Sequence, residues 1–221
     1  MIFTRWNRLP ALGVGLFVLA CGGNGGGGGT EPPGPPAQLV KGGDNQSWYF
    51  NNALPAPFSV TVSDANGRRV PNVTVAWAAT LGDGTVSATQ STTNASGVAT
   101  TTYTLGPSEP VQTVTATVGD LPAVTFTANA SAPPTTAAVT VNNNFFSPRD
   151  VVIQTGGTVT WTWNSGGERH DVDYDGGPTP LPASSSPQVS GTHSNTITTV
   201  GRYTYHCNFH SGMTGSVRVV N

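Results

Sequence analysis

The sequence predicts an all-β protein with two β-sandwich domains in tandem, preceded by an export signal and a flexible tether. Short segments alternate apolar and polar residues with a period of two, and turn signals separate them at intervals of about 8–12 residues. Threonine, serine, valine and glycine dominate the composition, which favours strands and turns over helices. Charged residues make up 9% of the 221 residues, against roughly 25% in ordinary soluble domains.

The composition excludes several functional classes. Nine basic and eleven acidic residues give a net charge of −2, which provides no basic patch for nucleic acid. The chain has two cysteines, Cys21 and Cys207, and two methionines, of which Met1 is the start residue. This count argues against a disulfide framework, a four-cysteine zinc site and an iron–sulfur cluster.

Residues 1–20 are predicted to be a secretory signal. Arg5 and Arg8 precede an apolar run from Leu9 to Ala20, and this run is too short to span a bilayer. The end of the segment, Val18-Leu19-Ala20-Cys21, resembles a bacterial lipobox, which implies cleavage before Cys21 and lipid attachment to it. The alternative is an ordinary signal peptide with an incidental cysteine. We expect a lipid-anchored protein of the cell envelope, on the periplasmic face or at the cell surface.

Residues 21–36 are predicted to be a tether between the anchor and the folded protein. Seven of the eight residues from Gly22 to Gly29 are glycine, and such a segment behaves as a flexible coil. The stretch Pro32-Pro33-Gly34-Pro35-Pro36 is stiffer and extended. A spacer directly after a lipidated cysteine fits attachment to a membrane.

Residues 37–130 are predicted to form the first sandwich. Its alternating segments include Phe58 to Ser63, Val73 to Trp77 and Val114 to Val118. The phrases from Val60 to Gly67, Val70 to Val75 and Thr93 to Ala99 resemble bacterial Ig-like domains of the invasin/intimin type. In that family such modules are mostly stalks, so the resemblance implies a spacer rather than an adhesive tip.

Residues 131–136 are predicted to be a Pro/Thr linker, and residues 137–221 a second sandwich that carries the chemistry. Its informative segment is Cys207-Asn208-Phe209-His210-Ser211-Gly212-Met213, a C-x2-H-x2-M motif. A thiolate, an imidazole and a thioether on one turn suit copper, which takes two histidines and one cysteine with a weaker methionine. The second histidine must come from elsewhere.

The alternation of side chains along a strand helps to identify which of the other histidines is the second ligand. If Tyr205 and Cys207 share the buried face, His206 points to the opposite face. His193 lies in a polar stretch and is expected to be a solvated loop residue. His170, which follows a Gly-Gly turn, is therefore the best remaining ligand candidate.

The second domain resembles the cupredoxins, the plastocyanin/amicyanin family of blue copper proteins with a Greek-key sandwich. The resemblance lies in His170-Asp171-Val172 and the C-x2-H-x2-M motif, together with the lead-in from Phe145 to Trp161. It implies one type 1 copper per chain, held by His170, Cys207, His210 and Met213. Many members have Asn where Asp171 stands; Asp171 can serve as a hydrogen-bond acceptor that holds the cysteine loop. Many also have Pro where Phe209 stands, a difference that changes the apolar rim around His210.

Zinc is the competing metal, but a thioether ligand and the absence of a carboxylate in the loop argue against it. Four protein ligands leave no open position, so we expect no enzymatic activity and no small-molecule substrate. We expect a monomeric, membrane-tethered carrier of single electrons between transient protein partners. By resemblance, His210 would be the electron port, with Phe209, Gly212 and Phe145 or Phe146 as an apolar rim. The alternatives are a copper-handling lipoprotein and a surface adhesin with a scaffold copper domain.

Overall fold

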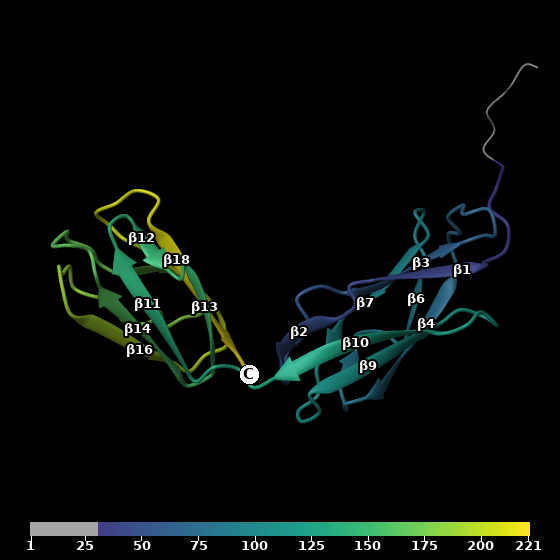
Figure 1. Ribbon diagram of the computed structural model, residues 1–221, viewed down its shortest axis with the longest axis horizontal. Coiled ribbons are helices and arrows are strands. Elements are labelled where there is room, and N and C mark those ends of the chain that lie inside the picture. Colours follow the sequence, from purple (N-terminus) through teal and green to yellow (C-terminus); the bar gives the residue numbers. More distant parts are fainter. Residues whose placement is uncertain (1–30) are drawn as a thin grey trace, which may run out of the picture. The chain divides into compact units, whose positions relative to one another are not determined.

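The computed structural model describes residues 31–221, and within this range all regular secondary structure is β-strand, as the sequence predicts (Figure 1). The predicted signal (1–20), the predicted lipidation site Cys21 and most of the predicted tether (21–36) lie outside the described residues. No helix that could span a membrane occurs between residues 31 and 221.

Ten strands make up the first domain. They are β1 (Gln38–Gly42), β2 (Gln46–Tyr49), β3 (Phe58–Ser63), β4 (Thr74–Leu81), β5 (Thr85–Val86), β6 (Gln90–Thr92), β7 (Val98–Thr101), β8 (Tyr103–Thr104), β9 (Val111–Thr117) and β10 (Val124–Ser131). Strands β1-β3-β7 form one sheet, β2-β10-β9-β4-β6 form a second, and β5-β8 form a small ribbon. Strand β2 joins β10 in parallel, whereas the other pairs of this domain are antiparallel.

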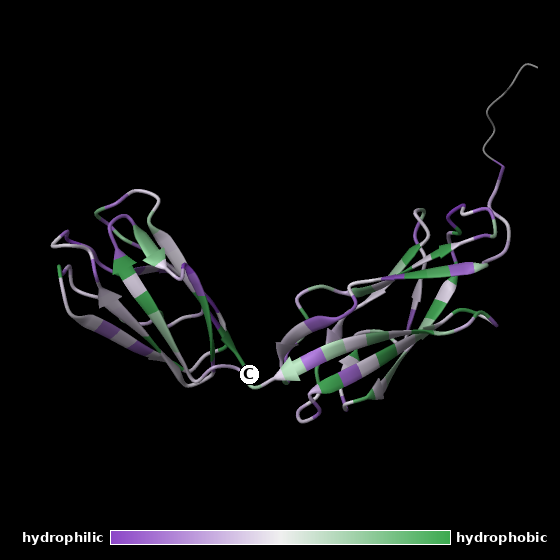
Figure 2. Ribbon diagram, in the orientation of Figure 1, coloured by the Kyte–Doolittle hydropathy of each residue, from purple (hydrophilic) through white to green (hydrophobic). Residues whose placement is uncertain are grey.

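The core of the first domain follows from the period-two pattern of its strands. In β9, Gln112, Val114 and Ala116 are buried while the threonines between them are not, and Figure 2 shows the same alternation as bands of colour along the strands. Aromatic rings fill the centre: the Phe58 ring lies 4.7 Å from that of Phe126 and 6.0 Å from that of Tyr103.

Eight strands make up the second domain. They are β11 (Thr136–Asn142), β12 (Phe145–Ser147), β13 (Asp150–Gln154), β14 (Gly157–Trp163), β15 (Asp173–Gly176), β16 (Thr192–Ile197), β17 (Gly201–His206) and β18 (Thr214–Val220). They form two four-stranded sheets, ordered β12-β11-β14-β16 and β13-β18-β17-β15. The pairs β11–β14 and β13–β18 are parallel.

The core of the second domain is aromatic and lies between its two sheets. The Trp161 ring on β14 meets the ring of Tyr205 on β17 edge-on at 5.3 Å, and the ring of Tyr174 on β15 edge-on at 6.2 Å. On β18, a side chain at Gly215 would come within 2.5 Å of the Tyr205 ring, so only glycine fits there. This packing fixes β17 and β18, the two strands that carry the Cys207–Met213 loop.

Candidate metal centre

The Cys207–Met213 loop joins two antiparallel neighbours, β17 and β18, whose last register pair is His206 with Thr214. Side chains alternate along β17, so Tyr203, Tyr205 and Cys207 are buried while His206 lies on the opposite face. The alternation of buried and exposed side chains therefore continues to the end of β17 and places the Cys207 thiol in the interior. Cys207 is 3% exposed.

Main-chain hydrogen bonds close this loop on itself. The N–H of Cys207 donates to the carbonyl of Met213 at 3.0 Å, and the N–H of Met213 donates to the carbonyl of His210 at 3.1 Å. Gly212 has φ of 81°, in the left-handed region that glycine adopts without strain. The short spacing of C-x2-H-x2-M thus becomes a tight turn that gathers its three potential ligands.

His170 reaches the same end of the domain from a separate segment. It follows β14 and a turn, and its backbone exchanges two hydrogen bonds with Gln188, at 3.0 and 2.9 Å. The indole N–H of Trp163 donates to the His170 carbonyl at 3.2 Å. Three main-chain contacts therefore fix the backbone of a histidine whose side chain is fully buried.

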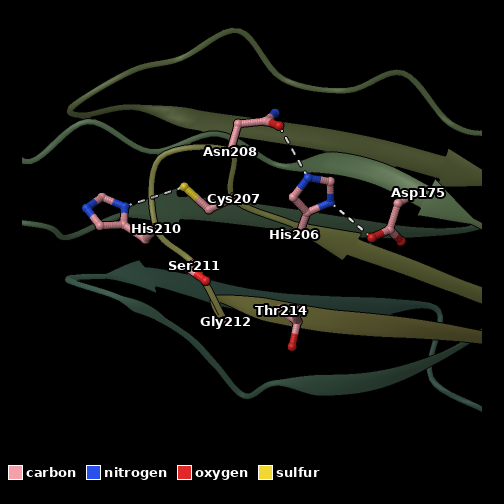
Figure 3. Close-up of a pocket in the computed structure, with 8 residues that line it drawn as sticks. All are labelled: Asp175, His206, Cys207, Asn208, His210, Ser211, Gly212 and Thr214. Atoms are coloured by element: carbon pink, nitrogen blue, oxygen red, sulfur yellow. Dashed lines mark hydrogen bonds and ion pairs between the residues drawn. The ribbon is translucent and has the colours of Figure 1, made fainter.

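The structure brings three of the predicted ligands together. The Sγ of Cys207 lies 3.6 Å from Nδ1 of His170 and 3.6 Å from Nδ1 of His210, and the three ligand atoms all lie within 4.8 Å of one another. The two imidazole rings are 4.3 Å apart between centroids. Figure 3 shows the Cys207 sulfur directed toward the His210 ring. Both histidines present the same nitrogen, Nδ1, to the thiol.

Met213, the fourth predicted ligand, is buried at the end of the loop, with 1% of its surface exposed. Its backbone contacts both Cys207 and His210 through the hydrogen bonds that close the turn. It belongs to the same core cluster as Cys207. The Met213 side chain is therefore shielded from solvent at the end of the ligand loop.

Burial shifts the pKa values of two of the candidate ligands, His170 and Cys207. Burial lowers the pKa of His170, and the nearby His210 lowers it further. Burial also raises the pKa of the Cys207 thiol, while hydrogen bonds from the backbone N–H groups of Asp171 and Phe209 oppose that rise. Burial therefore disfavours the charged forms of both side chains, while the two backbone N–H groups favour a thiolate.

Asp171 links the His170 segment to the Cys207–Met213 loop. Its carboxylate accepts the backbone N–H of Asn208 at 2.8 Å and the Asn208 side-chain amide at 2.9 Å. The sequence predicted an acceptor role for Asp171 but did not identify Asn208 as the donor. The signal was available, because Asp171 directly follows His170 and Asn208 directly follows Cys207.

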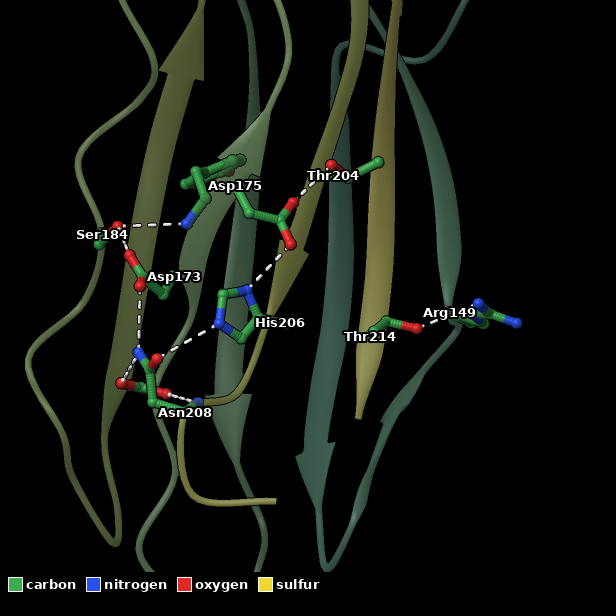
Figure 4. Close-up of polar contacts among 10 residues, drawn as sticks. Arg149, Asp173, Asp175, Ser184, Thr204, His206, Asn208 and Thr214 are labelled. Carbon is green, nitrogen blue, oxygen red and sulfur yellow. Dashed lines mark hydrogen bonds and ion pairs between the residues drawn. The ribbon is translucent and has the colours of Figure 1, made fainter. Parts of the chain in front are cut away.

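His206 takes part in a polar network on the outer face rather than in the centre. Its Nδ1 lies 3.0 Å from Asp175 and its Nε2 lies 3.2 Å from the Asn208 side-chain oxygen. Asn208 also donates to Asp173, and Ser184 donates to Asp173 (Figure 4). Asp173 and Asp175 both lie on β15.

The prediction for His193 was wrong. His193 lies in strand β16, not in a loop; its Nε2 is 3.0 Å from the carbonyl of Ala183 and its ring packs 5.9 Å from that of Trp161. The polar residues around it alternate along a strand whose outer face is wet, and this pattern resembles a loop in composition. His193 is not a member of the His170–Cys207–His210 group.

Of the three phenylalanines expected to contribute to an apolar rim, two are exposed and one is buried. Phe145 is 55% exposed and Phe209, in the ligand loop, is 47% exposed, whereas Phe146 packs edge-on against Tyr205 in the core. Of the two candidates Phe145 and Phe146, only Phe145 presents its ring to solvent. Beside the Cys207–Met213 loop lies a shallow pocket of about 420 Å³, lined by Asp175, His206, Cys207, Asn208, His210, Ser211, Gly212 and Thr214.

The residues present fit a copper ion. Two imidazole nitrogens and one thiolate in a trigonal arrangement, with a nearby thioether, form the donor set of an electron-transfer copper site. A structural zinc site prefers four strong ligands, and in the described part of the chain no carboxylate joins the His170–Cys207–His210 group. The donor chemistry therefore favours copper over zinc.

Two family models match the chain, one for each domain. Residues 45–131 match the bacterial Ig-like domain (group 1), and residues 135–220 match the copper binding proteins of the plastocyanin/azurin family. No curated protein matches the chain.

Solved structures similar to this chain include three cupredoxins, each covering 38% of it. A purple cupredoxin from Nitrosopumilus maritimus is 26% identical over 99% of its own length, with a TM-score of 0.34. A reduced amicyanin variant is 26% identical over 82% of its length, with a TM-score of 0.34. A plastocyanin from Dryopteris crassirhizoma is 22% identical over 99% of its length, with a TM-score of 0.33.

Proposed function

Because residues 45–131 are a bacterial Ig-like domain and residues 135–220 are a copper-binding domain of the plastocyanin/azurin family, we propose that the protein is a membrane-tethered carrier of single electrons. The proposal assigns one type 1 copper per chain to His170, Cys207, His210 and Met213. The observation that carries it is the convergence of the two Nδ1 atoms and the Cys207 sulfur, within 4.8 Å of one another.

The proposed role is that of a carrier rather than an enzyme. Copper bound at this centre would supply one reversible one-electron couple. Four protein ligands would leave no position open for a substrate. The chain's own contribution is rigidity: the hydrogen bonds of the Cys207–Met213 loop and of His170 hold the donors in one arrangement whichever oxidation state is bound.

Half-buried His210 supports its proposed role as the electron port. Unlike fully buried His170, it lies partly at the surface, and its neighbour Phe209 is exposed. Phe145 supplies a second exposed apolar ring in the same domain. Small apolar contacts of this kind suit a transient encounter with a protein redox partner, which must dissociate after each electron.

The proposed location is the extracytoplasmic side of the cell envelope, with the lipid on Cys21 and the Ig-like domain as a spacer. It rests on the lipobox-like end of the predicted signal and on the glycine-rich segment that follows. Cys21→Ser should release the protein from the membrane fraction while copper binding is retained. A variant that stays in the membrane fraction would contradict lipid attachment at this residue.

The carrier role is tested by stopped-flow kinetics on the full chain loaded with copper. We expect one equivalent of copper per chain, and rapid single-exponential reduction and reoxidation by small inorganic redox reagents. Slow electron exchange, combined with transfer of Cu(I) to a copper-free acceptor, would contradict the carrier role and identify a copper-handling protein. The His210→Ala variant should slow the exchange, whereas His193→Ala, which is not in the ligand group, should not.

A further inference from the structure

The backbone that carries His170 belongs to neither sheet of the second domain. It lies between β14, which ends at Trp163, and β15, which begins at Asp173, and no regular strand includes it. Hydrogen bonds join it to residues 183–188, a second segment without regular strand structure. The register of the two sheets therefore leaves the position of His170 open, and contacts with other segments must fix it.

The pairing of these two segments is regular at His170 and changes two residues later. His170 and Gln188 exchange both of their backbone hydrogen bonds, at 3.0 and 2.9 Å. A regular antiparallel ladder would next pair Val172 with Ser186 in the same way. Instead, the N–H of Ser185 donates to the Val172 carbonyl at 2.9 Å, and the N–H of Val172 donates to the Ser185 hydroxyl at 2.9 Å. The Ser185 hydroxyl thus takes the place of a backbone carbonyl.

Without this hydroxyl, the N–H of Val172 would lose the acceptor that the structure gives it. The Val172 side chain is fully buried, and Ser185 is half-buried. A buried N–H without an acceptor is costly, so this part of the backbone would shift or open to water. Because Val172 is only two residues beyond His170, such a movement would displace the backbone from which the His170 ring reaches the Cys207 thiol.

Residues 183–188 are themselves held at other points, so they can act as a fixed support. The side-chain amide of Asn195 on β16 donates to the Ala183 carbonyl at 2.9 Å. The Ser184 hydroxyl donates to Asp173 on β15 at 2.6 Å (Figure 4), and it accepts the N–H of Tyr174 at 3.2 Å. Strands β15 and β16 are edge strands of the two sheets. The segment is therefore fastened to an edge of each sheet.

We propose that Ser185 is a positioning residue for His170. Its hydroxyl holds the N–H of Val172 and so fixes the backbone from which the Nδ1 of His170 comes within 3.6 Å of the Cys207 sulfur. The inference rests on the proposed copper function. Ser185 acts through this backbone and not on the metal, and its effect is to keep one ligand in place before copper binds.

Copper affinity of the full chain, measured by competition with a chelator, tests the proposal. Ser185→Ala removes the acceptor and should weaken copper binding by about 10-fold, a typical effect of a residue that supports a ligand. Ser185→Thr keeps the hydroxyl and should bind copper like the wild type. Ser186→Ala is the matched control, because it removes a hydroxyl from the adjacent, exposed serine. Circular dichroism should show all four chains folded at the temperature of the measurement, so that a loss of global stability does not account for the difference.

Amide hydrogen exchange of the copper-free chain provides a second readout. The N–H of Val172 should exchange about 10-fold faster in Ser185→Ala than in the other three chains. If Val172 stays protected in Ser185→Ala, or if its exchange accelerates while copper affinity is unchanged, the positioning role is overturned. If both measurements follow the expected order but the wild type gives a colourless Cu(II) complex, the positioning role stands and the proposed function fails.

Discussion

The carboxylate of Asp171 holds Asn208 at two points, the backbone N–H at 2.8 Å and the side-chain amide at 2.9 Å. Asp171 directly follows one predicted ligand and Asn208 directly follows another, so this contact fastens the His170 segment to the Cys207–Met213 loop. Asp171 is 5% exposed, and hydrogen bonds to a buried carboxylate are stronger than those to a neutral acceptor.

Removal of this carboxylate should loosen the loop. Asp171→Ala leaves the Asn208 N–H without its acceptor, so we expect the free energy of unfolding of the copper-free protein to fall by about 1–3 kcal/mol. Asn208→Ala keeps the backbone hydrogen bond and should cost less. Urea unfolding, followed by tryptophan fluorescence, measures both. Asp175→Ala is the control, because its carboxylate contacts only Thr204 and His206 on the outer face. An Asp171→Ala chain as stable as the control would contradict the fastening role.

Substitutions at Met213 test the fourth ligand in variants that should still fold. Met213→Leu nearly conserves volume, so the protein should fold with a loss below about 1.5 kcal/mol. The axial ligand tunes the potential of this kind of copper site. We therefore expect potentiometric titration to show a higher potential for Met213→Leu and a lower one for Met213→Gln, whose oxygen is a harder donor. Identical potentials in the three chains would show that this side chain is not a ligand.

The two domains have separate hydrophobic cores, and a core substitution should therefore affect only its own domain. Phe58 is fully buried between Tyr103 and Phe126 in the first domain. Phe58→Ala should destabilise this domain by about 3–5 kcal/mol. Calorimetry should show one transition shifted to lower temperature, while the visible spectrum of the copper-loaded protein stays the same. Loss of the spectrum would contradict the independence of the two cores.

Asp64 should make the first domain sensitive to acid. Its carboxylate accepts the backbone N–H groups of Gly34, Asn66 and Arg68 at 2.8–2.9 Å, and these hydrogen bonds, the one from Gly34 foremost, hold its pKa below the usual value. A group whose pKa is lower in the folded state contributes stability above its unfolded pKa of about 3.9. That contribution is lost as the pH falls through the folded pKa.

Urea midpoints at pH 7 and near pH 2 measure this dependence. The acid-induced loss should be smaller in Asp64→Asn, which cannot titrate, than in the wild type. Asp120→Asn, at an exposed position after β9, should behave like the wild type. An Asp64→Asn chain with the full acid dependence of the wild type would assign that dependence to other groups.

The sequence predicts the position of a side chain best where the alternation along one strand, or the residue spacing within one loop, determines it. The period-two pattern places Tyr205 and Cys207 inside and His206 outside without any knowledge of the partner strands. The C-x2-H-x2-M spacing likewise brings Cys207 and His210 together, because a turn of seven residues leaves them few other arrangements.

The rest depends on contacts between distant segments, which no local pattern encodes. His193 has the composition of a loop residue, yet the pairing of β16 with β14 places its ring against Trp161. The backbone pairing of His170 with Gln188, which fixes the position of a predicted ligand, is likewise not signalled by any local pattern. Residues 1–30 lie outside the described structure, so the lipidation of Cys21 stays a prediction.

The visible absorption spectrum of the full chain with one equivalent of Cu(II) tests the central claim most directly. A Cys207 thiolate bound to copper should give an intense charge-transfer band that bleaches on one-electron reduction and returns on reoxidation. Cys207→Ser should abolish the band while the protein remains folded. A colourless Cu(II) complex of the wild type, or a band that survives in Cys207→Ser, would contradict the account.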